Sequence, residues 1–252
     1  MFTSTSRPLI IALAVGLLIA ACSSDPEATT ATTTTTTLTA TSAAPAVTDK
    51  ASPEEEVAAS GPVSFTAEVW ADNWFALWVN GVLIGEDSVP ITTERSFNAE
   101  TFVFDATYPL TIAIEAKDFK ETDSGIEYIG AANQQMGDGG LIAQFTDNES
   151  GELVAATSSD WNALVIHRAP LNTECERDAD PDATCEFEIT SAPSDWTTAS
   201  FDDTAWAAAT TWSEADVGPK DGYDKIDWDA ASALIWGDDL EIDNTVLLRH
   251  SA

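Results

Sequence analysis

The pattern that most constrains the fold begins at residue 62, where apolar and polar side chains start to alternate with a period of two. The runs 63–70 and 74–79 both follow this pattern. It is typical of β-strands, because successive side chains point to opposite faces of a sheet. Asn80 and Gly81 then separate two apolar runs. Both residue types accept a positive φ, so the dipeptide predicts a tight β-hairpin.

The rest of the chain repeats this organisation in short segments. Further strands are expected at Thr101–Phe104, Leu110–Ala116, Gly140–Phe145, Leu153–Ala156 and Asn244–Arg249. The segment Asp202–Ala209 is expected to form a helical turn or two, with Asp202 or Asp203 as its N-cap. Many short strands separated by turn residues indicate an all-β fold, either a sandwich or a jelly roll.

Three blocks of residues carry a family resemblance. Residues 71–85, ADNWFALWVNGVLIG, resemble the hairpin of galactose-binding-domain-like β-sandwiches. Residues 201–206, FDDTAW, are similar to a turn of that family, and residues 233–236 and 246–249 resemble its closing strands. The resemblance implies a galactose-binding-like jelly-roll β-sandwich over residues 62–252. Such modules accompany many glycoside hydrolases and carbohydrate esterases, and the fold also serves as a structural spacer.

The N-terminus indicates export. Arg7 precedes an uncharged apolar run from Leu9 to Ala21, which is too short to span a bilayer comfortably and matches the core of a signal peptide. The run ends in Ile19-Ala20-Ala21-Cys22, which resembles the lipobox of bacterial lipoproteins. The resemblance implies cleavage after Ala21, diacylglycerol on the sulfur of Cys22 and acylation of the new amino group. Residues 1–21 are therefore expected to be a lipoprotein signal peptide, the alternatives being an ordinary signal peptide or an uncleaved anchor helix.

Residues 22–61 are expected to form a linker. The segment is mostly Thr, Ala, Ser and Pro and includes six consecutive Thr from Thr32 to Thr37. This composition cannot bury enough apolar surface to fold. As a flexible coil the linker would span about 35 Å. The expected localisation is extracytoplasmic, with the folded domain held on the bacterial cell membrane by its lipid.

The cysteines agree with an exported protein. With Cys22 assigned to the lipid, Cys175 and Cys185 remain as an even pair. In an oxidising compartment such a pair predicts a disulfide. The residues between them are polar and lack apolar periodicity, so the bond is expected to close a local loop.

The charge excludes some partners and leaves a metal ion open. The chain has 43 Asp and Glu against 10 Lys and Arg, so nucleic acid and bare anionic lipid surfaces should be repelled. Asp178, Asp180 and Asp182 alternate as at the start of calcium loops, which makes calcium the candidate cofactor. Ala183 and Ile189 break the standard loop, however, and solvated carboxylates are the alternative.

The sequence offers no catalytic constellation. No hydrolase elbow, zinc-binding helix motif or phosphate-binding glycine loop is present. His167 is expected to be a strand residue that faces solvent. His250 lies near the C-terminal end, and no pattern around it indicates a function. Two acidic pairs are attributed to chance in so acidic a chain. These pairs are Glu115 with Asp118 and Asp238 with Glu241.

The tryptophans carry the ligand hypothesis, because sugar-binding sandwiches place flat aromatic faces against a pyranose. Trp74 and Trp78 share a strand face and are expected to pack in a core. Four tryptophans in polar, loop-like surroundings are the candidates for ligand binding: Trp161, Trp196, Trp212 and Trp228. The sequence thus predicts a non-enzymatic, lipid-anchored protein that binds carbohydrate. The alternatives are a structural or protein-interaction module of the cell surface and an unrecognised carbohydrate-active hydrolase.

Overall fold

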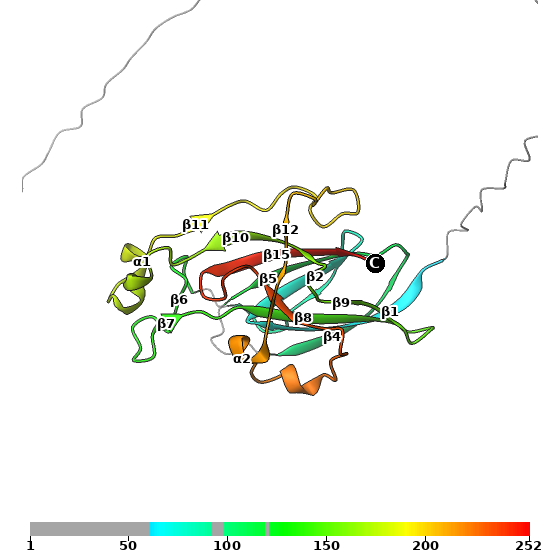
Figure 1. The fold of residues 1–252 in the computed structure, drawn as a ribbon, viewed down its shortest axis with the longest axis horizontal. Coiled ribbons are helices and arrows are strands. Elements are labelled where there is room, and N and C mark those ends of the chain that lie inside the picture. The colour runs from blue at the N-terminus through cyan, green and yellow to red at the C-terminus, as the bar shows by residue number, and fades with distance from the viewer. Residues whose placement is uncertain (1–60, 92–97, 119–120) are drawn as a thin grey trace, which may run out of the picture. The chain divides into compact units, whose positions relative to one another are not determined.

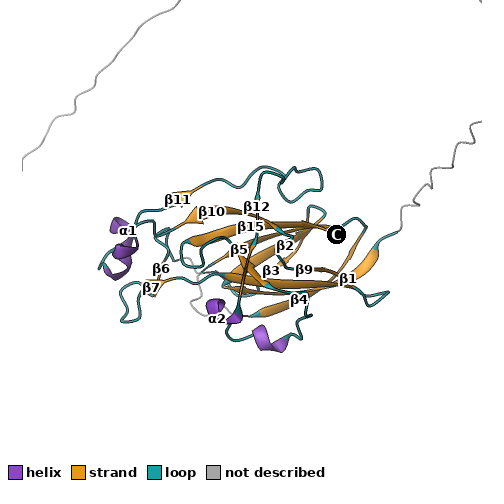
Figure 2. Ribbon diagram, viewed as in Figure 1, coloured by secondary structure: helices purple, strands orange, loops and turns teal. Residues whose placement is uncertain are grey.

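The computed structural model describes residues 61–91, 98–118 and 121–252. Two antiparallel β-sheets pack face to face in this part of the chain (Figure 1). Strands dominate and helices are short (Figure 2). The predicted signal peptide, Cys22 and all of the predicted linker except Gly61 lie outside the described residues. No helix in the described ranges combines the length and apolar character needed to cross a membrane.

The first sheet has six strands, in the order β13-β14-β8-β1-β4, with β9 also paired to β8. Its strands are β1 Val63–Asp72, β4 Ala99–Ala106, β8 Gly140–Asp147, β9 Leu153–Ala156, β13 Thr210–Trp212 and β14 Leu234–Trp236. The central strand β1 pairs along its length with β4 on one side and β8 on the other. The contact between β14 and β8 is narrow, because it is made by the single residue pair Ile235 and Leu141.

The second sheet has seven strands, in the order β11-β10-β15-β5-β2-β3, with β12 also paired to β10. Its strands are β2 Trp74–Val79, β3 Val82–Glu86, β5 Thr111–Lys117, β10 Asn162–Arg168, β11 Glu188–Ile189, β12 Ala207–Ala208 and β15 Asp243–Ser251. A two-stranded hairpin and four short helical turns complete the described elements. These are β6 Ile126–Glu127, β7 Gln135–Met136, η1 Thr173–Arg177, α1 Pro181–Thr184, α2 Glu214–Val217 and η2 Tyr223–Lys225.

The main core lies between the two sheets, where alternate strand residues point inward. The largest of its fully buried side chains include Phe65, Phe75, Leu77, Ile112, Ile114, Phe145, Trp161 and Trp236. A second apolar layer covers the outer face of the seven-stranded sheet. It contains Ala113, Leu247 and Trp196, with Trp78, Leu164, Ile166, Phe201 and Trp206 packed against them.

The hairpin predicted at Asn80 and Gly81 is confirmed. Both residues have positive φ values, 52° and 80°, and the turn joins β2 to β3. The side chain of Asn80 also ties the turn to its surroundings, donating to the Thr107 carbonyl and accepting from the Thr111 amide. Asn is therefore used both for its backbone conformation and for its side-chain hydrogen bonds.

The predicted strands are confirmed, with boundaries that differ by a few residues. The helical turn predicted for Asp202–Ala209 is wrong. The amide of Trp206 donates to the carbonyl of Asp203 in a turn, and Ala207 and Ala208 then pair with β10. Strand pairing with β10 therefore overrides the local helical preference of this segment.

The predicted disulfide is also confirmed. Cys175 and Cys185 are bonded, with their Cα atoms 5.3 Å apart, and both side chains are buried against Ile126. The amide group of Gln134 donates to two carbonyls of the enclosed loop, those of Glu176 and Asp178. The disulfide thus closes a local loop that rests on the β6–β7 hairpin, apart from the main core.

Candidate functional site

The candidate site is a groove of about 300 Å³ at the free edge of the seven-stranded sheet. Its floor is formed by β10 and β12. One wall carries Trp206, and the opposite wall is the turn that joins β14 to β15. The lining residues that carry polar or aromatic groups are Arg168, Trp206, Asp238 and Asp243. This volume lies at the lower end of the range for small-molecule sites.

Trp206 provides the aromatic wall of the groove. Its indole is partly exposed, and it packs against Trp196 at 6.3 Å and against Phe201 at 5.6 Å between ring centroids. Ala207 and Ala208 follow Trp206 directly in the chain and pair with β10, and this pairing fixes the backbone next to Trp206. One side of the indole is therefore supported by other rings, while the remainder faces the groove.

A buried arginine holds the turn that presents Trp206. Nε of Arg249 donates to Oδ2 of Asp203 at 2.8 Å, and its terminal nitrogens donate to the carbonyls of Trp196 and Thr198. Neighbouring Asp202 accepts from the amide and the hydroxyl of Thr204, and these hydrogen bonds lower the pKa of Asp202. Both aspartates of the 201–206 block thus shape the turn itself.

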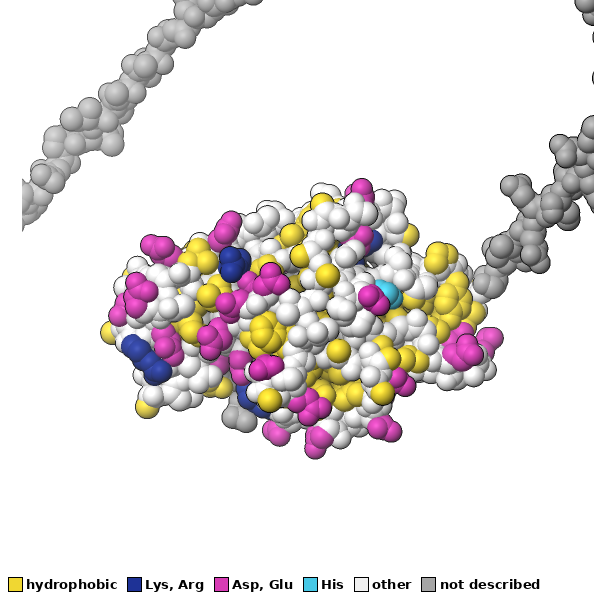
Figure 3. Space-filling model, viewed as in Figure 1, with side chains coloured by type: hydrophobic (Ala, Val, Ile, Leu, Met, Phe, Trp, Pro, Cys, Tyr) yellow, Lys and Arg dark blue, Asp and Glu magenta, His cyan; other side chains and the backbone are white. Residues whose placement is uncertain are grey.

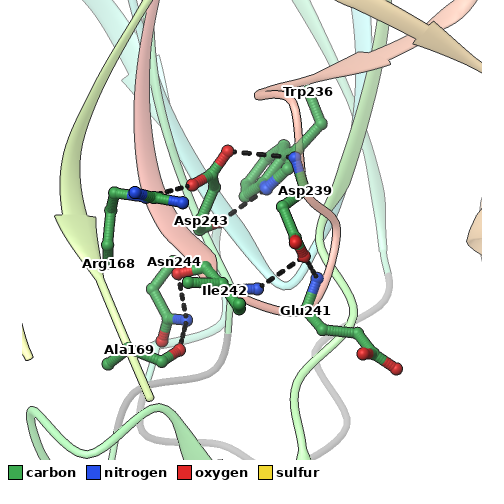
Figure 4. A network of polar contacts seen from close by, with 8 residues as sticks. All are labelled: Arg168, Ala169, Trp236, Asp239, Glu241, Ile242, Asp243 and Asn244. Carbon is green, nitrogen blue, oxygen red and sulfur yellow. Dashed lines mark hydrogen bonds and ion pairs between the residues drawn. The ribbon is translucent and has the colours of Figure 1, made fainter. Parts of the chain in front are cut away.

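A network of polar contacts holds the opposite wall (Figure 4). Nε of Arg168 donates to Oδ1 of Asp243 at 2.9 Å, and the amide of Asp239 donates to Oδ2 of Asp243 at 3.1 Å. The indole of Trp236 donates to the carbonyl of Asp243 at 2.6 Å. The side chain of Asp243 is 3% exposed, whereas that of Arg168 is 45% exposed. Asp243 therefore orients Arg168, and the outer end of the guanidinium remains open to the groove.

Asp238 provides an exposed carboxylate at the rim. Its Oδ1 accepts from the hydroxyl of Thr210 at 2.8 Å, which links the turn to the strand segment after Trp206. Figure 3 looks onto this face, where hydrophobic side chains lie among acidic ones over the segment that leads from β12 toward α2. The groove thus combines an indole, a guanidinium donor and a carboxylate acceptor, held by two independent networks.

The four tryptophans predicted to bind ligand divide into two pairs. Exposure is contradicted for Trp161 and Trp196, which are 0% and 9% exposed. Trp161 stacks on Phe145 and donates to the Ala156 carbonyl, and Trp196 packs under Trp78. Their polar sequence neighbours occupy turns at the surface while the indoles point inward.

Trp212 and Trp228 are partly exposed, as predicted, and their role in ligand binding stays a prediction. Trp212 donates to the Gly237 carbonyl at 3.2 Å and lines a second hollow next to the groove. Trp228 donates to the carbonyl of Tyr223 and lies against its ring. Trp74 and Trp78 are also partly exposed, because they lie on the outer face of β2, away from the main core.

His167 does not face solvent as predicted. It lies near the end of β10 and is 2% exposed. Its Nε2 lies 3.1 Å from the Asp123 carbonyl, and its ring meets Phe187 edge-on. The pairing of β10 with β15 is irregular between Val165 and His167 and between His167 and Arg168, and beyond these irregularities Arg168 pairs with Asp243 and lines the groove.

The predicted calcium ligands gain no support from the geometry. Asp178, Asp180 and Asp182 are all exposed, and Asp180 occupies the N-cap position of the short helix α1 without a side-chain capping hydrogen bond. Across the described ranges, no group of three or more His, Cys, Asp or Glu side chains converges as metal ligands would. Calcium binding at this loop stays an untested prediction.

A larger hollow of about 490 Å³ lies between the ends of the sheets and the disulfide loop. Its aromatic residue is Phe187, and its polar residues include Lys117, Asp123 and Asp182. Ile91 and Glu121 in its wall adjoin stretches outside the described residues. The Trp206 groove, by contrast, is lined by residues well inside the described ranges.

A buried carboxylate, Asp72, lies at the end of β1, outside the groove. Burial raises the pKa of Asp72 well above its usual range, and Nζ of Lys220 lies 3.5 Å from Asp72 and 3.4 Å from Asp138. Burial also raises the pKa of Asp138, against the opposing effect of Lys220. Lys220 therefore connects the loop before η2 to the end of β1.

No known protein family matches the chain, and searches of curated proteins and of solved structures found no match either. Function is therefore argued from the site.

Proposed function

We propose that the protein is a non-enzymatic carbohydrate-binding protein whose ligand lies in the Trp206 groove. The observation that supports this proposal is the partly exposed indole beside Arg168 and Asp238. An indole offers a flat apolar surface to the C–H face of a pyranose. A guanidinium donates to sugar oxygens, and a carboxylate accepts from sugar hydroxyls. The resemblance to galactose-binding-like jelly rolls supports the same class of ligand.

The charge of the chain favours a neutral sugar. With 43 acidic against 10 basic residues, an anionic polysaccharide would be repelled at long range. Arg168 supplies donors within the groove, but its charge is balanced by Asp243. A neutral ligand can therefore use Arg168 for hydrogen bonds without an electrostatic cost.

The test is a glycan-array screen of the purified full-length protein, followed by calorimetry with each sugar that binds. Trp206→Ala and Asp238→Ala should each weaken binding at least about tenfold, which corresponds to roughly 1.4 kcal/mol. Trp74→Ala and Asp105→Ala are matched controls, because they remove a partly exposed indole and an exposed carboxylate outside the groove. Absence of glycan binding would contradict the proposal and favour a structural role at the cell surface.

We further propose that the protein is held on the outer side of the cell membrane by a lipid on Cys22. The lipobox resemblance at residues 19–22 supports this proposal. Cys22→Ser should release the protein from the membrane fraction or leave its precursor uncleaved. Unchanged processing and membrane retention of the variant would refute the lipid anchor. Cys175→Ser with Cys185→Ser is the control, because it replaces the two disulfide-bonded cysteines without touching the lipobox.

A further inference from the structure

We propose that the Trp206 groove continues into a second hollow lined by Trp212, and that together they bind one extended sugar chain. The ligand would then be an oligosaccharide of two or more units rather than a single sugar. This inference rests on the proposed function and specifies its ligand. It requires that the two hollows adjoin, that each offers a surface for a sugar, and that their positions are fixed relative to each other.

The second hollow has a volume of about 440 Å³. It contains one indole, that of Trp212, and one aliphatic side chain, that of Leu240. Five carboxylates complete its lining: Asp138, Asp216, Asp238, Asp239 and Glu241. It therefore repeats the composition of the first groove, with one aromatic surface and several hydroxyl acceptors, but without a guanidinium.

The two hollows share residue Asp238. They also share their walls. The segment from Ala205 to Trp212 passes from β12 in one sheet to β13 in the other, and it contributes Trp206 to the first hollow and Trp212 to the second. The turn after β14 forms the facing wall of both, contributing Gly237 and Asp238 on one side and Asp238 to Glu241 on the other.

Hydrogen bonds fix the two walls to each other at the junction. The hydroxyl of Thr210 donates to Asp238 at 2.8 Å, and the indole of Trp212 donates to the Gly237 carbonyl at 3.2 Å. Both contacts join the crossing segment to the turn. The two indoles are therefore held on one framework, and Asp238 lies where a ligand would pass from one hollow to the next.

The spacing suits a chain of sugars. Trp206 and Trp212 are six residues apart on a largely extended segment, which spans at most about 20 Å. A short oligosaccharide can span a separation of this size and contact both indoles. Because the second hollow adds four carboxylates to the shared Asp238 and no basic side chain, the sugar chain should be neutral or bear ammonium groups.

The test uses galactose, glucose and N-acetylglucosamine together with their β-linked dimers through hexamers, titrated by calorimetry into the purified full-length protein. We expect affinity for the favoured sugar to rise at least about tenfold from monomer to oligomer. Trp212→Ala should abolish this rise, and Glu241→Ala, which lines the Trp212 hollow but not the Trp206 groove, should reduce it and leave the monomer affinity unchanged, whereas Trp206→Ala should weaken both. Glu241→Ala provides a second variant of the Trp212 hollow should Trp212→Ala fold poorly, since Glu241 is exposed. Trp74→Ala is the matched control, because it removes a partly exposed indole outside both hollows.

The outcomes separate this inference from the proposed function. Equal affinity for monomer and oligomers, or a length dependence that survives both changes in the Trp212 hollow, would overturn the inference and leave carbohydrate binding intact. Lack of binding by every sugar in the series and on the glycan array would overturn both.

Discussion

Arg168 and Arg249 lie near opposite ends of the same pair of strands, β10 and β15, yet the structure uses them differently. Each donates through Nε to an aspartate, at 2.9 Å and 2.8 Å respectively. The side chain of Arg249 is 3% exposed and all three of its nitrogens are engaged. That of Arg168 is 45% exposed and opens onto the groove. Burial and donor use thus distinguish an arginine that holds a loop from one available to a ligand.

Replacing Arg249 should give the larger effect. Arg249→Met would leave two buried carbonyls and the carboxylate of Asp203 without their donor, and each lost partner carries a desolvation cost. We expect the free energy of unfolding to fall by about 3 kcal/mol, measured by chemical denaturation. Asp203→Asn is a graded control that keeps both carbonyl contacts and an acceptor oxygen. A loss below about 1 kcal/mol for Arg249→Met would contradict the structural role.

Replacing Arg168 should have a smaller effect on stability. Arg168→Met removes one half-exposed ion pair, and we expect the free energy of unfolding to fall by about 1 kcal/mol. Its main effect should be weaker binding of any sugar found in the glycan screen. Arg168→Lys keeps the charge but not the planar guanidinium, so it separates the contribution of the charge to sugar binding from that of the guanidinium's hydrogen-bonding geometry. If Arg168→Met binds sugar as tightly as the unchanged protein, Arg168 has no role in ligand binding, and the proposed distinction between the two arginines is wrong.

Local patterns were enough to predict much of the fold. Alternation gave the main strands, and Asn80-Gly81 gave the hairpin, because both features act between residues close in the sequence. The disulfide followed from an even cysteine pair. The error at Asp202–Ala209 arose from the pairing of Ala207 and Ala208 with β10, a contact that depends on the complete sheet.

The candidate site was less accessible from sequence. Trp161 and Trp196 have polar neighbours in the chain, but the orientation of their backbone places both indoles inside. Arg168, Trp206 and Asp238 are distant in sequence, and strand pairing brings them to one groove. The resemblance at residues 201–206 included Trp206 but did not indicate that its side chain lines a groove. The charge of the chain offered one further signal. Basic residues are few, 10 against 43 acidic ones, so an arginine in a strand is a candidate for a specific role.

The order of the six-stranded sheet has a mechanical consequence for a tethered protein. Strand β1 follows the proposed membrane tether, and β13 carries Trp212 at the other side of the same sheet. Tension between a ligand held at Trp212 and an anchor at Cys22 would load β1, β8, β14 and β13 in series. The narrow junction between β14 and β8, formed by Ile235 and Leu141, would be the first part of this ladder to yield. Resistance to pulling would then depend on the rate at which that junction opens rather than on the stability of the whole domain.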